Sequence, residues 1–236
     1  MYVSTRGIVL HTTKYSDHSL IVKIYTLSHG TQSFIIKNAF TKKKNAGAAL
    51  FTPLALLQIT YDDHYLNQLK YLKEVDYANH DLLYADDPAI STIQLFYCEL
   101  LYKLLFDAGE DQELFLFLEE EIALMYQPNV ALNILPLQFL LRLSVRLGFM
   151  PQNNYSSTCR FFSLPEGKFL AYCIDETSTM PQEESFLLHQ LLSEQKPATN
   201  RLTRVNLLHY LVRYYQTHNE HLRNISSLDI LSAVLH

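Results

Sequence analysis

Apolar and polar residues alternate with a period of two along roughly the first third of the chain. This alternation is typical of strands with one buried face, and turn-forming residues separate the alternating segments. We predict five strands, at residues 6–14, 20–26, 34 onward, 51–60 and 66–77. Five short strands, with a tight turn before the second, predict a small closed barrel of the OB type, whose usual ligands include single-stranded nucleic acids.

After Asp76 the apolar positions recur every three to four residues, which is the period of a helix. Asp87 and Pro88 form a helix start, and Gly109 and Gly148 are signals for a helix end. We predict helices at residues 88–108, 111–126, 136–147, 182–194, 200–217 and 226–235. The sequence therefore predicts an α+β chain, with a barrel domain at residues 1–78 and a helical domain at residues 79–236. An irregular, strand-poor insert occupies residues 149–180 of the helical domain.

Composition indicates an ordinary folded protein. Of the 236 residues, 48% are hydrophobic and 18% are charged, which argues against disorder. The apolar stretch at the start is too short for a signal peptide, and no run reaches the roughly 18 apolar residues of a membrane span. Three cysteines do not make a disulfide framework, so we expect a reduced, cytoplasmic protein.

Charge is distributed unevenly along the chain. The formal net charge is +5 for residues 1–75, -11 for residues 76–126 and +1 for residues 127–236, which sum to the whole-chain value of -5. This asymmetry indicates that the ends of the chain meet an anionic partner and that the middle does not.

The most basic stretch, residues 37–52, contains four lysines and no acidic residue. It lies between two predicted strands, and two interpretations are open. Lysines at such a turn can keep a sheet edge soluble and unpaired. They can also contact the phosphates of a bound nucleic acid. The charge of the barrel and its fold type favour the phosphate-contacting interpretation.

Catalytic motifs are missing from the sequence. Neither glycine-rich phosphate loop occurs, and there is no H-E-x-x-H or G-x-S-x-G. We therefore predict a binding protein and not an enzyme.

Two sets of basic residues are candidates for binding. Single-stranded nucleic acid requires only a cationic track and rings on which bases stack, and the predicted DNA contacts of the barrel are Arg6, Lys14, Lys37, Phe40, Lys42, Lys43 and Lys44. Arg142 and Arg146 are spaced i, i+4 on an apolar helix, where paired arginines can hold a carboxylate. Ordinary surface arginines, or an ion pair with the acidic middle of the chain, are the alternative for this second pair.

Cys159 and Cys173 lie in the insert. A structural zinc site needs four ligands, usually as two C-x-x-C pairs, and neither cysteine has such a neighbour. We expect no zinc and no other cofactor, and an insert packed by its aromatic residues.

Several short motifs, in this order and spacing, resemble the RecO family of bacterial recombination mediators over essentially the full length. They are R-G-I-V-L at 6–10, K-Y-S-D at 14–17, I-K-N-A at 36–39, F-T-P-L at 51–54, R-L-G-F-M-P at 146–151 and I-S-S-L-D-I-L at 225–231. Two departures are visible. The family often has four cysteines in the insert, where this chain keeps Cys159 and Cys173. The family usually has a glycine where Asn38 stands, and asparagine is a residue that tolerates a left-handed turn.

The resemblance implies a non-enzymatic role in DNA repair at the nucleoid. RecO-like proteins bind single-stranded and duplex DNA, anneal complementary strands and associate with RecR. They also bind the acidic C-terminal tail of the single-stranded-DNA-binding protein and help to load the recombinase. For this tail we expect an apolar groove beside Arg142 and Arg146. The alternative function is an OB-fold adaptor that binds RNA or a protein partner.

Overall fold

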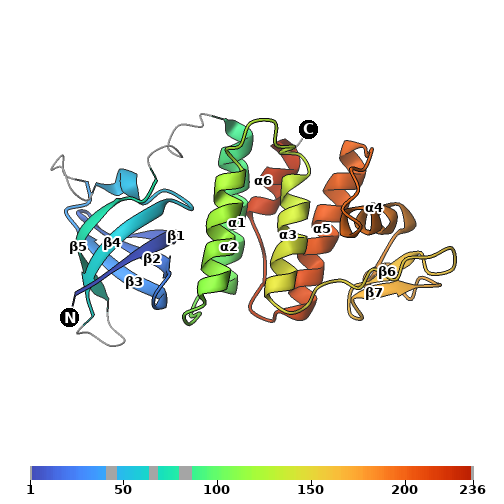
Figure 1. Cartoon of the computed structure of the whole chain (residues 1–236), viewed down its shortest axis with the longest axis horizontal. Coiled ribbons are helices and arrows are strands. Elements are labelled where there is room, and N and C mark those ends of the chain that lie inside the picture. The colour runs from blue at the N-terminus through green and yellow to red at the C-terminus, as the bar shows by residue number, and fades with distance from the viewer. Residues whose placement is uncertain (1, 41–46, 64–68, 80–86, 235–236) are drawn as a thin grey trace. The chain divides into compact units, whose positions relative to one another are not determined.

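The computed structural model describes residues 2–40, 47–63, 69–79 and 87–234. The chain forms two compact units, Met1–Pro128 and Asn129–His236, and each is described by itself (Figure 1). Unit 1 contains the barrel together with the first two helices. The boundary predicted after residue 78 therefore falls inside unit 1, and the barrel domain of residues 1–78 stays a prediction.

Five strands of unit 1 close into a barrel, which confirms the predicted fold class. They are β1 (Tyr2–Ser16), β2 (Ser19–Thr26), β3 (Gly30–Lys37), β4 (Leu56–Asp62) and β5 (Lys70–Tyr77). Their order around the barrel is β1-β2-β3-β5-β4, and β4 pairs with β1 to close it. Only the β3–β5 pair is parallel.

The alternation in the sequence sorts side chains between the inside and the outside of the barrel. Inward-facing apolar residues fill the interior, where Val22, Ile24, Phe34, Ile59 and Tyr61 are fully buried. Because the interior takes every second residue of each strand, the pattern fixes the register of neighbouring strands.

Several predicted strand starts were wrong. The first strand begins at Tyr2 and the third at Gly30, each four residues before its predicted start. The fourth strand begins at Leu56 and not at residue 51, because Phe51 ends a short 3₁₀ helix, η1 (Ala48–Leu50). Leu54 is buried with a left-handed φ of 58°. The apolar residues of this connection made its sequence pattern look like that of a strand, although its backbone turns. The fifth strand begins at Lys70, and residues 64–68 lie outside the described part of the chain.

The two helices of unit 1 start at the predicted caps. In α1 (Pro88–Leu104) the side chain of Asp87 accepts a hydrogen bond from the backbone N–H of Ala89. In α2 (Gln112–Leu124) the side chain of Asp111 accepts one from Leu114. These carboxylates satisfy backbone donors that have no partner within the helix.

Hydrogen bonds accepted by backbone carbonyls join the barrel to these helices. The Thr31 N–H donates to the carbonyl of Ala108 at 2.9 Å, and the Thr31 hydroxyl donates to the carbonyl of Leu105 at 2.5 Å. The buried thiol of Cys98 donates to the carbonyl of Leu10 at 2.9 Å. The loop between α1 and α2 therefore lies directly against the start of β3.

Unit 2 consists of four helices and a small sheet. The helices are α3 (Leu135–Arg146), α4 (Gln182–Leu192), α5 (Arg201–His218) and α6 (Ser227–Val234). The sheet has the order β7-β6-β8, from β6 (Phe161–Ser163), β7 (Lys168–Leu170) and β8 (Thr179–Met180). The insert therefore contains three short strands that we did not predict, because strands of two or three residues are too short to show a period. Ser185 joins the insert to α4: its hydroxyl accepts a hydrogen bond from the Phe162 N–H and donates one to the Met180 carbonyl.

No helix among the described residues is long and apolar enough to cross a membrane.

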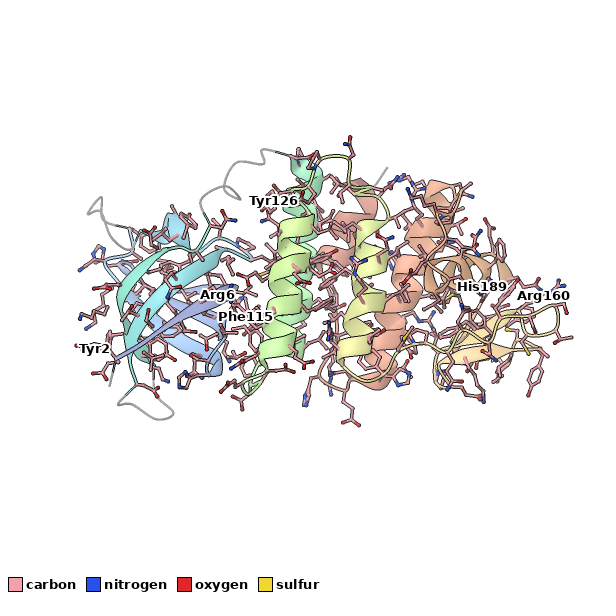
Figure 2. All side chains as sticks on the ribbon, viewed as in Figure 1. Tyr2, Arg6, Phe115, Tyr126, Arg160 and His189 are labelled. Atoms are coloured by element: carbon pink, nitrogen blue, oxygen red, sulfur yellow. The ribbon has the colours of Figure 1, made fainter. Side chains whose placement is uncertain are left out.

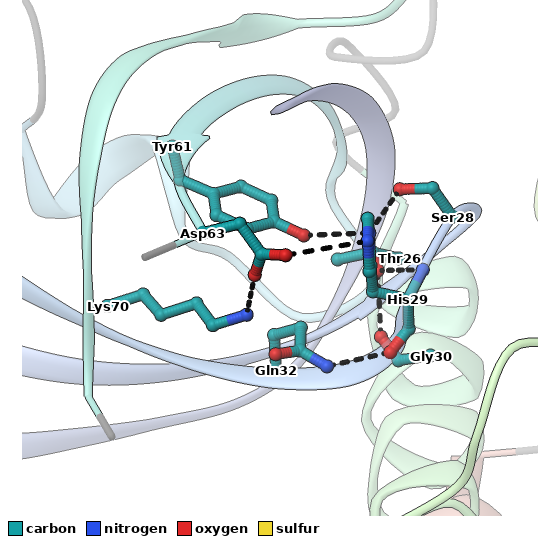
Figure 3. A network of polar contacts seen from close by, with 8 residues as sticks. All are labelled: Thr26, Ser28, His29, Gly30, Gln32, Tyr61, Asp63 and Lys70. Atoms are coloured by element: carbon teal, nitrogen blue, oxygen red, sulfur yellow. Dashed lines mark hydrogen bonds and ion pairs between the residues drawn. The ribbon is translucent and has the colours of Figure 1, made fainter. Parts of the chain in front are cut away.

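A polar network lies inside unit 1 at one end of the barrel (Figure 3). The ammonium of Lys70, whose side chain is 7% exposed, donates to Asp63 at 2.5 Å. Asp63 also faces His29 at 3.8 Å, and the Tyr61 hydroxyl lies 3.1 Å from Nδ1 of His29. The hydrogen bond from Lys70 lowers the pKa of the Asp63 carboxyl, and burial raises the pKa of Tyr61 to about 12. Asp63 is therefore the charge that compensates a buried ammonium.

Asp63→Asn should destabilise the protein by about 2 kcal/mol at pH 7, because the buried ammonium of Lys70 loses its counter-ion. The folded-state pKa of Asp63 is lowered, so its contribution is present above the unfolded pKa, near 4, and is lost as pH falls through the folded-state value. Urea unfolding at pH 7 and pH 3 would measure both effects. The control Asp17→Asn removes a carboxylate that is 89% exposed, and it should change stability by less than about 0.5 kcal/mol.

Gly30→Ala should destabilise the protein by more than about 2 kcal/mol. Gly30 has a φ of 62°, and an added Cβ would collide with the backbone of Ala108 and Gly109. Gly47→Ala is the matched control: φ is -69°, and nothing lies within 4 Å of the added atom. A lowered urea midpoint for the first variant only is the expected result; equal midpoints would contradict the close approach of β3 and the α1–α2 loop.

Candidate nucleic-acid interface

Three of the predicted DNA-binding residues lie at one end of the barrel. Lys37 is the last residue of β3 and pairs with Ser19, while Lys14 pairs with Leu20 in the adjacent hairpin. Phe40 follows in the turn after β3, and its side chain is 51% exposed. Strand pairing therefore places two cations and a ring at the same end of the barrel.

The turn after β3 has the geometry expected of its sequence. Asn38 has a φ of 55°, so asparagine adopts the left-handed conformation that we predicted for it. Ala39 is buried, and its N–H donates to the carbonyl of His18 at 3.0 Å. The N–H of Ala48 donates to the carbonyl of Ala39 at 2.8 Å. Lys42, Lys43 and Lys44 lie between these anchors but outside the described residues, so their contacts with DNA stay a proposal.

Arg6 lies apart from the other predicted contacts, eight residues along β1 from Lys14 and opposite Gln58. Its guanidinium donates to both carboxylate oxygens of Glu119 in α2, at 2.6 and 2.5 Å. It also lies 5.7 Å from the centre of the Phe115 ring, and Figure 2 shows the two residues side by side. To contact a phosphate, Arg6 would have to exchange Glu119 for it. Sequence reasoning missed this pair because its members are separated by 113 residues.

The remaining cations and rings of the barrel differ in exposure. Lys14 pairs with Asp17 at 3.2 Å, but both side chains are largely in solvent, so this pair is weak. Tyr25 and Phe34 are fully buried and belong to the core. Tyr15 is 61% exposed and remains available for stacking. Tyr71 and Lys73 of β5 are also exposed, and we did not single them out from the sequence.

A groove of about 310 Å³ in unit 2 contains one of the two predicted arginines. Its walls come from α3, from α4 and from the residues that follow each helix: Gln138, Leu141, Arg142, Val145, Met150, Leu191, Leu192, Glu194 and Gln195. Val145 and Met150 are each half-exposed. Arg146 is exposed on the next turn of α3 and does not line the groove. An apolar groove beside a cation is the arrangement that we expected from sequence, and Arg142 supplies the cation.

The cysteines of the insert do not form a metal centre in the described structure. Cys159 is partly buried and Cys173 is exposed, and both are free thiols. Within the described ranges there is no group of three or more His, Cys, Asp or Glu side chains that could hold a metal ion. The donor set therefore does not fit the four-ligand zinc site of a metal-binding insert.

A closed five-stranded barrel with exposed cations and rings, followed by a helical unit, is an architecture found among nucleic-acid-binding proteins. Comparison with known families is more specific. The family model "Recombination protein O N terminal" matches residues 1–80, and "Recombination protein O C terminal" matches residues 85–227. The chain belongs to the RecO family of DNA repair proteins.

Curated relatives agree with this assignment. The chain is 31% identical over 242 residues to the DNA repair protein RecO of Flavobacterium psychrophilum, with 99% of each chain covered. It is 30% identical to the protein of that name from Phocaeicola vulgatus, with 98% of each covered. The protein from Porphyromonas gingivalis is 28% identical, with 99% of each covered.

Glu119→Gln should release Arg6 for a phosphate contact. We expect the slope of log affinity against log salt for single-stranded DNA to steepen by about 0.7, the value of one further contact. Glu120→Gln, an exposed neighbour on the same helix, makes the same change in net charge and should leave the slope as it is. Equal slopes for both variants would assign Arg6 to joining β1 with α2, and would remove it from the DNA site.

Proposed function

We propose that this protein is a recombination mediator without enzymatic activity. It binds and anneals single-stranded DNA, and it helps to load the recombinase on strands coated by the single-stranded-DNA-binding protein. Its partners are single-stranded and duplex DNA, RecR and the acidic C-terminal tail of the coating protein, in the cytoplasm at the nucleoid. The observation that carries the proposal is the groove of unit 2, whose lining combines apolar side chains with Arg142.

The groove suits a short tail that ends in an apolar residue and a carboxylate. Leu141, Val145 and Met150 offer apolar surface, and Arg142 offers donors in a fork that matches a carboxylate. Glu194, on the opposite wall, limits how many acidic residues can enter the groove. The tail would therefore bind with its terminus beside α3 and with its other acidic residues outside.

The barrel supports the DNA-binding part of the proposal. Lys14, Lys37 and Phe40 lie together at one end, and the basic stretch of residues 42–44 continues from them in sequence. Cations supply affinity for the phosphate backbone of any sequence, and exposed rings favour strands whose bases are unstacked. A mediator that handles strands of all sequences requires this kind of binding.

Two substitutions in the groove should change affinity for an acidic tail peptide in opposite directions. Arg142→Ala should weaken binding roughly tenfold to a hundredfold, because a charge-assisted hydrogen bond is lost. Glu194→Gln should strengthen it severalfold, because a repelling carboxylate becomes neutral. Calorimetric titration with a peptide that ends in an acidic, aromatic-terminated sequence would measure both.

Arg160→Ala is the matched control, since Arg160 is an exposed arginine of the same unit outside the groove. Annealing of complementary strands coated by their binding protein should fall in Arg142→Ala and not in Arg160→Ala. Peptide affinity that is equal in all three variants would exclude the groove as the tail site. Annealing no faster than the spontaneous rate in the unmodified protein would contradict the proposed function itself.

A further inference from the structure

Two exposed tyrosines and two lysines lie on the outer surface of the barrel, across β1, β4, β5 and β3. Lys37 Nζ is 4.9 Å from the centre of the Tyr71 ring, and Lys73 Nζ is 4.2 Å from the centre of the Tyr2 ring. Tyr71 is 50% exposed and Tyr2 is 59% exposed. We call these four residues the Tyr71 track.

Strand register explains why the track is continuous. Tyr2 of β1 lies opposite Asp62 of β4, and Tyr71 of β5 lies opposite Ile35 of β3. Tyr61 of β4 pairs with Leu72 of β5 in antiparallel register, so Asp62 and Tyr71 are the next residues of these two strands. Because opposite residues in adjacent strands share a face, the two rings lie near the same level of the barrel. Figure 2 shows Tyr2 at the end of the barrel away from Arg6 and Phe115.

A bulge in β5 adds Lys73 to this face. Tyr61 pairs with Leu72 and Thr60 pairs with Glu74, so Lys73 is an extra residue without an opposite partner. Leu72 and Val75 both pack against the barrel core, although they are three residues apart. Lys73 and Glu74 between them are both exposed. Bulges re-aim side chains in this way, and here the bulge turns a second cation outward.

The chemistry of the track matches a single strand of nucleic acid. Each exposed ring can stack with one base whatever its identity, and each lysine is placed beside a ring where it can meet the adjoining phosphate. Duplex DNA is a poor fit, because its bases are already stacked and their faces are not available.

Acidic residues set the limits of the track. Glu74 and Asp76 are exposed further along β5, so the phosphate backbone would leave the barrel before it reaches them. Asp62 lies between the two rings in register. A carboxylate there repels phosphate. The track therefore holds bases toward the sheet and phosphates toward the lysines.

We propose that the Tyr71 track binds single-stranded DNA, with Tyr71 and Tyr2 stacking on bases and Lys37 and Lys73 contacting phosphates. The proposal rests on the proposed function, and it assigns to the single strand a surface on β5 and β1 in addition to the end of the barrel that carries Lys14 and Phe40.

A second aromatic cluster of unit 1 does not offer the same surface. His11 stacks on Tyr102 at 4.3 Å, and Tyr102 meets Phe106 edge to face. Lys23 Nζ lies 3.2 Å above the Phe106 ring and donates to the Phe106 carbonyl at 2.8 Å. These rings already stack on one another, and their cation is engaged, so the cluster serves to pack α1 against the barrel.

Binding of oligonucleotides to the full chain tests the track. Tyr71→Leu keeps apolar bulk but removes the ring, and it should weaken binding of single-stranded DNA about tenfold, while Tyr71→Phe should bind as the unmodified protein does. Neither Tyr71 variant should change the slope of log affinity against log salt. Lys73→Ala should reduce the slope by about 0.7. Tyr172→Ala and Lys168→Ala, at exposed positions of unit 2, are the matched controls and should change neither quantity.

An abasic strand separates stacking from loss of fold. If Tyr71 stacks on a base, Tyr71→Leu and the unmodified protein should bind an abasic oligonucleotide with equal affinity. Unchanged affinity of Tyr71→Leu for a strand with bases would overturn the track. If Tyr71→Leu lowers the affinity for the abasic strand as much as the affinity for the strand with bases, the ring has a structural role and the track is again excluded.

These outcomes are distinct from failure of the proposed function. An unmodified protein that binds no single-stranded DNA would contradict both proposals. An unmodified protein that binds and anneals strands, while Tyr71→Leu matches it throughout, would contradict the track alone.

Discussion

Unit 1 depends on the pairing of β1 with β4. Without it, two strands would each expose a row of unpaired N–H and C=O groups, and such an edge invites pairing with another chain. The register from Tyr2–Asp62 to Ile8–Leu56 removes both edges at once. Closure also separates an apolar interior from an outer surface. The outer surface is then free to carry cations and rings without any cost to the core.

The position of each candidate DNA contact follows from that closure. The β1–β2 hairpin and the end of β3 meet at one end of the barrel, and Lys14, Lys37 and Phe40 come together there. Arg6 lies eight residues before Lys14 in β1, where its guanidinium pairs with Glu119 of α2. The acidic segment that made the charge of the chain asymmetric therefore has a structural role: one of its carboxylates neutralises a cation of the barrel. Net charge by segment indicated an anionic partner, but it could not tell which cations are already paired.

The periodic elements of this chain were predictable from sequence because each depends on local signals. Period-two alternation located the five strands, and Asp87 and Asp111 marked helix starts through the backbone donors that they satisfy. Contacts distant in sequence were not predictable. Nothing near Arg6 indicates Glu119, and nothing near Leu54 indicates that a buried leucine would have a left-handed backbone. The strands of the insert were missed because two or three residues show no period. Lys73 was not singled out because only the register with β4 reveals the bulge.

The hydrogen bond from Ala48 to Ala39 has a consequence for how this family can vary. This bond, 2.8 Å from the nitrogen of Ala48 to the carbonyl oxygen of Ala39, joins the two ends of an eight-residue segment. Both ends are fixed by other contacts of the barrel. The length of such a closed segment affects stability only slowly, by roughly 0.6 kcal/mol for each doubling. Residues can therefore be inserted, deleted or exchanged between these two alanines without moving a strand. Evolution can thus change the number of lysines in this part of the sequence independently of the barrel.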